Sequence, residues 1–159
     1  MIALAQRLDW TVPATLAGAF VLDGLPLPAG PDHFAPDWLM LVLVYWCLAL
    51  PRRIGVLTGW GLGLVVDAAR GQVLGQHALV YAVLAFLVHK GRQPLRLAPF
   101  WQQWAAVLAF LLIARLLLGW LDGMLGYPPR DIGYFAPLLG ALVAWPLLQA
   151  LLGGLRRRT

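Results

Sequence analysis

The chain of 159 residues contains no serine and no glutamate, and its single cysteine is Cys47. The absence of serine excludes a serine nucleophile, and the absence of glutamate excludes the Glu-containing metal motifs. No histidine pair at metal-binding spacing is present either. One cysteine cannot form an intramolecular disulfide, and Cys47 lies in an apolar run where packing is its expected role. We therefore expect a protein that is not an enzyme and binds no metal or cofactor.

Charged residues are scarce, at 12% of the chain, whereas 61% of the residues are hydrophobic and the mean hydropathy is +0.76. A soluble domain of this length could not bury so much apolar surface. The net charge of +5 comes from cations beside apolar segments, which favours anionic membrane lipid over nucleic acid as a partner. The composition predicts an all-α integral membrane protein, with residues 1–159 forming one transmembrane domain.

Six apolar runs predict a bundle of six transmembrane helices. They lie at about residues 10–27, 38–50, 54–69, 74–88, 101–121 and 134–152. The second and third runs are shorter than the roughly 20 residues that cross a bilayer core, but interfacial Trp and Arg residues can extend them. A soluble bundle would explain the short runs but not their number or the near absence of polar faces.

The first run has a second interpretation, as a signal peptide, because Leu16-Ala17-Gly18-Ala19 loosely resembles a cleavage site. Asp9 weakens the positive start, and the run continues to Leu27. We expect an uncleaved first helix.

Basic residues are distributed unevenly between the two ends of the six runs. One side carries Arg7, Arg52, Arg53, Lys90, Arg92, Arg96, Arg156, Arg157 and Arg158. The other side carries only Arg70 and Arg130. Because Lys and Arg are retained on the cytoplasmic side, this predicts a multi-pass membrane protein with both termini in the cytoplasm.

A stripe of small residues runs along the third predicted helix. Gly55, Gly59 and Gly63 recur at every fourth residue, and Asp67 occupies the next step. In a helix this spacing puts all four on one face, where another helix can approach closely. Gln76 and His77 open the next run, so we expect the polar ends of these two helices to lie together.

A second stripe, Ala136, Gly140 and Ala144, lies in the last predicted helix. It is explained either by close packing inside the bundle or by an interface for a helix of another protein. The sequence does not separate these two interpretations.

The helix rise of 1.5 Å per residue places Asp67, Arg115 and His77 at nearly the same depth, beside Gln76. Charges inside a membrane are costly and usually pair within the bundle. This polar layer could bind a ligand or a proton, or it could be a structural pair of Asp67 with Arg115. A local pair of Asp67 with Arg70 is a third possibility.

Several motifs in consecutive order resemble the MreD family, the rod shape-determining membrane proteins of bacteria. They are Pro36-Asp37-Trp38, Tyr45-Trp46, Pro51-Arg52-Arg53-Ile54-Gly55, Gly63-Leu64-Val65-Val66-Asp67, Leu74-Gly75-Gln76-His77-Ala78-Leu79 and Trp145-Pro146-Leu147-Leu148. The resemblance covers roughly residues 36–158. The block from Gly63 to Leu79 is its most specific part because order and spacing both agree.

The resemblance implies a non-enzymatic scaffold or regulatory subunit of the bacterial elongation complex, which maintains rod cell shape by coupling the cytoskeleton to peptidoglycan synthesis. It implies MreC as a partner, and also MreB, RodA and the transpeptidase that works with RodA. It further implies a six-helix fold similar to the substrate-binding membrane subunits of vitamin-uptake transporters. A substrate-binding subunit of a small-molecule uptake transporter is therefore the alternative function. The outer loops, which offer mainly Asp and Pro, favour the scaffold.

Overall fold

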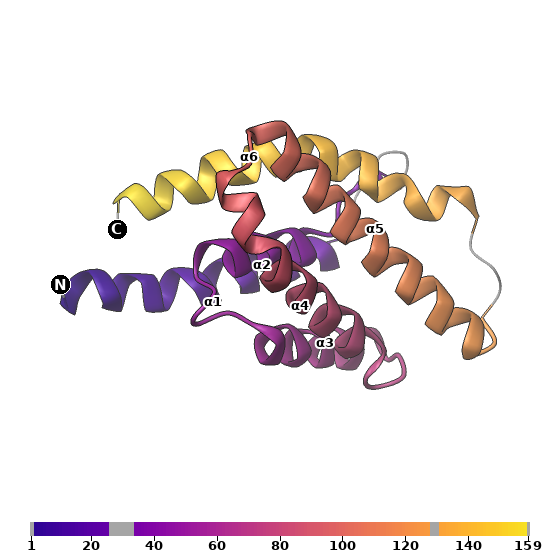
Figure 1. The fold of residues 1–159 in the computed structure, drawn as a ribbon. Coiled ribbons are helices and arrows are strands. Elements are labelled where there is room, and N and C mark those ends of the chain that lie inside the picture. Colours follow the sequence, from indigo (N-terminus) through magenta and orange to yellow (C-terminus); the bar gives the residue numbers. More distant parts are fainter. Residues whose placement is uncertain (1, 26–33, 128–130, 159) are drawn as a thin grey trace.

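A computed structural model describes residues 2–25, 34–127 and 131–158 (Figure 1). Within these ranges the regular structure is entirely helical. The elements are α1 (Ile2–Gly24), α2 (Trp38–Ala49), α3 (Val56–Arg70), α4 (Gln76–Leu97), α5 (Phe100–Met124), the short 3-10 helix η2 (Ile132–Phe135) and α6 (Ala136–Arg158). An all-helical fold is thus what the composition led us to expect.

The helices differ from the predicted runs mainly at two places. α1 begins at Ile2, well before the expected start at residue 10, and the expected end at residue 27 lies outside the described residues. We expected the fourth helix to end at about residue 88, and this was wrong, because α4 continues to Leu97. Basic side chains are favourable near the carboxyl end of a helix, and no proline interrupts this segment before Pro94.

Two stretches are long and apolar enough to cross a membrane, Phe100–Met124 and Gly133–Gly154, and α2 is a shorter apolar helix. Apolar side chains on α5 and α6 point outward, among them Leu112, Leu116 and Val143. A water-exposed surface of this kind would be costly, whereas lipid tails accommodate it. The prediction that six helices span the membrane remains a prediction.

The core is built around α2, whose residues Leu39 to Val44 are buried on every side of the helix. α2 contacts α1, α4 and α6. The Trp46 indole N–H donates to the Thr15 hydroxyl of α1 over 2.9 Å, which satisfies a polar group inside this apolar contact. A helix that is hydrophobic all round is expected to be the most enclosed one in a bundle.

The other helices are arranged outside α2. α3 packs along α4, and α4 in turn contacts α5, which pairs with α6 (Figure 1). The first turns of α1 and the last turns of α6 lie at the same side of the view in Figure 1. The arrangement brings the carboxyl ends of α1, α3 and α5 toward the starts of α2 and α4, where the polar residues gather.

Candidate functional site

The close contact of α3 with α4 depends on glycine. A Cβ atom added at Gly59 would lie 2.6 Å from the carbonyl oxygen of Tyr81, and one at Gly63 would overlap the backbone of Ala78. A Cβ at Gly55 would lie 3.3 Å from Nε2 of His89. The first glycine stripe therefore lies along α4, which allows the two backbones to approach each other.

Asp67, the last residue of that stripe, is fully buried and binds the start of α4. Its Oδ1 accepts hydrogen bonds from the His77 backbone N–H at 2.9 Å, and its Oδ2 accepts from the N–H groups of Gly75 at 2.9 Å and Ala78 at 3.3 Å. The first N–H groups of a helix have no partner within the helix, so a carboxylate there satisfies them and matches the helix dipole. Asp67, which lies on α3, thus caps the start of α4.

The side chain of His77 adds a further contact, because its Nδ1 lies 2.8 Å from Oδ1 of Asp67. Gly71 and Gly75 both adopt positive φ, at 61° and 104°, in the turn that joins the two helices. Other residues rarely adopt this backbone conformation, so the two glycines allow the chain to reverse within a few residues. The conspicuous block from Gly63 to Leu79 is therefore one helical hairpin closed by a buried carboxylate.

Arg115 on α5 does not pair with Asp67, which corrects one expectation from the sequence. Its Nε and Nη2 donate to Oδ2 of Asp37 at 3.0 and 2.5 Å, and its Nη1 donates to the carbonyl oxygen of Tyr134 at 2.7 Å. The Tyr134 ring lies against the guanidinium, 4.8 Å from Cζ to the ring centroid. Arg115 therefore joins α5 to the start of α2 and to η2.

The local pairing of Asp67 with Arg70 was the other structural alternative. In the structure, Arg70 is exposed at the end of α3, whereas the buried carboxylate of Asp67 bonds to α4. Gln76, at the start of α4, donates from Nε2 to Oδ1 of Asp122 on α5. The polar layer thus exists as separate contacts between helices and not as one cluster around Asp67 and Arg115.

Asp23 is a structural residue that the sequence analysis did not single out. Its carboxylate, on the last turn of α1, accepts hydrogen bonds from the N–H groups of Trp38 at 2.8 Å and Leu39 at 3.0 Å. It caps α2 as Asp67 caps α4. A signal was present in the sequence, since an aspartate lies near the end of each odd-numbered helix, at positions 23, 67 and 122.

The second small-residue stripe faces the chain's own backbone at its centre. A Cβ atom at Gly140 would overlap the carbonyl oxygen of Phe34 and lie 3.1 Å from Pro36. Ala144 is buried and Ala136 is partly buried. At Gly140 the close approach is therefore made within this chain, between α6 and the segment that leads into α2.

These contacts connect neighbouring helices at one end of the bundle: α1 to α2, α3 to α4, α4 to α5, and α5 to α2 and η2. Among the described residues there is no group of three or more His, Cys, Asp or Glu side chains that could hold a metal ion. Buried and half-buried carboxylates that bond to amides and to a guanidinium hold helices in register. In the described residues, the contacts of the polar layer therefore join helices to one another.

Comparisons with known proteins place the sequence in a family. Residues 5–152 match the family model described as rod shape-determining protein MreD. A curated relative from Haemophilus influenzae, named Rod shape-determining protein MreD, is 34% identical over 157 residues, which cover 95% of this chain and 94% of the relative. No solved structure matches the chain. Both matches span nearly the whole sequence, and the chain belongs to the MreD family of bacterial rod shape-determining membrane proteins.

Proposed function

We propose that this protein is a scaffold or regulatory subunit of the bacterial elongation complex, where it couples the cytoskeleton to peptidoglycan synthesis. The observation that carries the proposal is the family match over residues 5–152, because this family determines rod cell shape and is not known as an enzyme. The partners we propose are MreC first, and also MreB, RodA and the transpeptidase that works with RodA.

The architecture supports such a role through its surfaces. Asp67 and Arg115 form hydrogen bonds within the chain, near the starts of α4 and α2. α5 and α6, in contrast, present apolar side chains outward. A protein built in this way acts through its membrane-facing helix surfaces and its short loops, since those are the parts that a partner can reach. We propose that MreC and the wall synthases contact these surfaces.

We also propose that the protein crosses the inner membrane six times with both termini in the cytoplasm. The positive-inside rule supports this orientation. Arg52, Arg53 and Lys90 lie at the turn after α2 and on the carboxyl half of α4, away from the end where Asp67 and Asp23 cap the helices. Basic residues and capping carboxylates thus occupy opposite ends of these helices.

A substrate-binding subunit of an uptake transporter is the competing function. Such a subunit needs polar side chains that are free to bind a ligand in its outer half. Asp67, Asp23 and Arg115 are instead bonded within the chain. The scaffold is therefore the better proposal, and the six-helix fold shared with vitamin-uptake subunits stays a prediction.

Isolation of the tagged protein from its own host in a mild detergent tests the proposal. Co-purification of MreC with RodA and its transpeptidase is the expected result. Co-purification of an ATPase module in place of these proteins would contradict the scaffold and favour the transporter subunit. A matched sample with Gly63→Leu, which should break the α3–α4 contact, controls for nonspecific capture by an apolar protein.

A further inference from the structure

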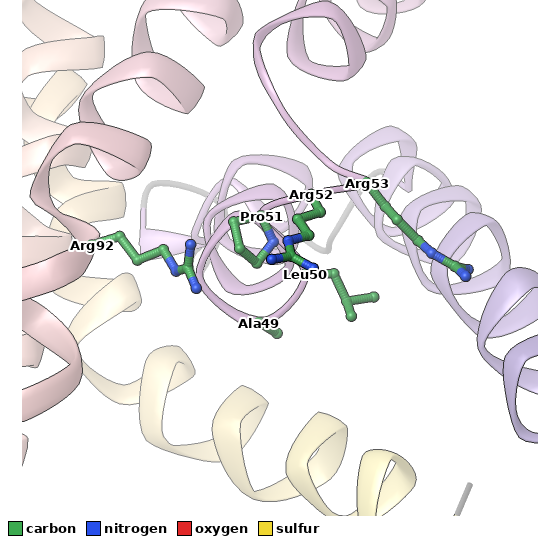
Figure 2. A pocket seen from close by; sticks show the side chains of 6 residues that line it. All are labelled: Ala49, Leu50, Pro51, Arg52, Arg53 and Arg92. Atoms are coloured by element: carbon green, nitrogen blue, oxygen red, sulfur yellow. The ribbon is translucent and has the colours of Figure 1, made fainter. Parts of the chain in front are cut away.

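A hollow of about 420 Å³ lies at the basic end of the bundle, between the turn that follows α2 and the carboxyl half of α4 (Figure 2). The residues that line it are Ala49, Leu50, Pro51, Arg52, Arg53 and Arg92. Half of these residues are arginines, and none of them is acidic. The hollow therefore concentrates positive charge beside a small apolar surface.

Beside this hollow, Arg92 places a hydrogen-bond donor without a partner in the described part of the chain. Its Nε atom is buried and has no hydrogen-bond partner among the described residues. A buried donor without an acceptor is costly, and an ordered water or a bound ion is one explanation for such a group. In Figure 2 the Arg92 side chain extends from α4 toward Pro51, with Arg52 on the far side of that proline.

The side chain of Arg53, the third arginine, points in a different direction. Figure 2 shows that Arg53 extends away from Arg92, toward the opposite side of the turn. Arg52 and Arg92 therefore come from two different elements and approach the same hollow, whereas Arg53 contributes to its outer edge. The hollow is therefore lined by guanidinium donors from two elements, and charge-assisted hydrogen bonds from guanidinium groups to phosphate oxygens are among the strong ones.

We propose that this hollow binds the phosphate group of an anionic phospholipid, with Arg92 and Arg52 as its ligands. A guanidinium presents a planar fork of N–H donors that matches phosphate oxygens, and it is less strongly hydrated than an ammonium group. Ala49, Leu50 and Pro51 supply apolar contacts for the glycerol and the first acyl carbons. Basic pockets between helices at the cytoplasmic face are sites of this chemistry.

The placement in the cytoplasmic leaflet rests on the membrane topology proposed above. The binding itself does not rest on it, because the test uses purified full-length protein in detergent and does not involve cell shape. A purely structural role for the arginines, in which they offset the partial negative charge at the carboxyl end of α2, would change stability equally with and without lipid. A lipid-dependent measurement therefore separates the two roles.

The experiment measures the melting temperature of the full chain in a neutral detergent while phosphatidylglycerol, phosphatidylcholine or inorganic phosphate is added. Phosphatidylglycerol should stabilise the wild-type protein at lower concentrations than phosphatidylcholine does. Arg92→Gln and Arg52→Gln should each weaken this response about fivefold, the value expected for one basic residue near an anionic surface. Arg92→Lys should retain part of it, because the charge remains but the fork is lost.

Arg70→Gln is the matched control, because it removes the same charge from an exposed position at the end of α3. It should respond to phosphatidylglycerol as the wild type does. Saturable stabilisation by inorganic phosphate that is lost in Arg92→Gln would also support the phosphate site, and it would assign a soluble phosphate compound as the ligand. An unchanged lipid response in both Arg92→Gln and Arg52→Gln, or an equal loss in Arg70→Gln, would overturn the proposal.

Discussion

Oδ1 of Asp67 lies 2.8 Å from Nδ1 of His77 and 2.9 Å from the backbone nitrogen of the same residue. One carboxylate oxygen at the end of α3 therefore binds both the side chain and the main chain at the start of α4. The contact is buried on both sides, since Asp67 is 0% and His77 is 3% exposed. This relationship fixes the register of the two helices and explains why Gly63 and Gly59 meet α4 where they do.

Replacing Asp67 should destabilise the protein strongly. Asp67→Asn keeps one acceptor oxygen but loses the charge, and Asp67→Ala leaves the N–H groups of Gly75, His77 and Ala78 without their acceptor. We expect a cost of about 1–3 kcal/mol for the first change and more for the second. Gel filtration of detergent-solubilised protein after heating measures this loss of stability. Asp131→Asn, at an exposed carboxylate, is the control, and equal losses in both would remove Asp67 from its capping role.

Glycine-to-alanine substitutions on the two faces of α3 should have different effects on folding. Gly63→Ala places a methyl group on the backbone of Ala78, whereas Gly61→Ala meets no atom within 4 Å. The first change should lower the yield of folded protein, and the second should leave it unchanged or raise it slightly because alanine favours helix. Fluorescence-detected gel filtration of tagged variants gives the comparison. Similar profiles for the two proteins would mean that α3 and α4 do not approach closely at Gly63.

A double-mutant cycle tests whether Asp37 is the ion-pair partner of Arg115. Because the Asp37 carboxylate accepts two hydrogen bonds from the guanidinium, Asp37→Asn and Arg115→Gln should be coupled by roughly 1–3 kcal/mol. The same cycle between Arg115→Gln and Asp67→Asn should give effects that simply add. Thermal stability in detergent provides the four values of each cycle. Coupling of Arg115 with Asp67 in place of Asp37 would restore the pair expected from the sequence and contradict the structure.

Asp23 should contribute to the stability of α2 although it lies on α1. Asp23→Ala removes the acceptor of the N–H groups of Trp38 and Leu39, and loss of a helix cap of this kind costs about 1–2 kcal/mol. Asp23→Asn should cost less, because the amide oxygen still accepts. The melting temperature of each variant in detergent measures the difference. An Asp23→Ala protein as stable as the wild type would show that α2 does not need this cap.

Reporter fusions at the carboxyl terminus and at a second site test the orientation of the protein in the membrane. A reporter that is active only in the cytoplasm should be active when it follows Thr159, because Arg156, Arg157 and Arg158 precede it. A second fusion, at Asp131 between α5 and α6, should be inactive in the cytoplasm and active with a periplasmic reporter. The opposite pattern at both sites would invert the topology.

The helical class and the number of long helices in the described residues were predicted from the sequence because they depend on local composition. Long apolar runs separated by proline and charged residues indicate helices wherever the rest of the chain lies. The glycine spacing in α3 was equally informative, since Gly55, Gly59 and Gly63 share a face of any helix that contains them. The extension of α4 through His89 was missed because basic residues are compatible with either a loop or a helix end.

The partners of the buried charges were decided only by the tertiary structure. The rise per residue gives the depth of Asp67 and Arg115 along their helices, but it does not give the neighbours that each helix faces. Asp67 faces α4 because a short glycine turn folds α4 back along α3, and Arg115 faces Asp37 because α5 lies beside the start of α2. A hydrogen bond requires direction as well as depth, and direction across a bundle is set by how the helices pack.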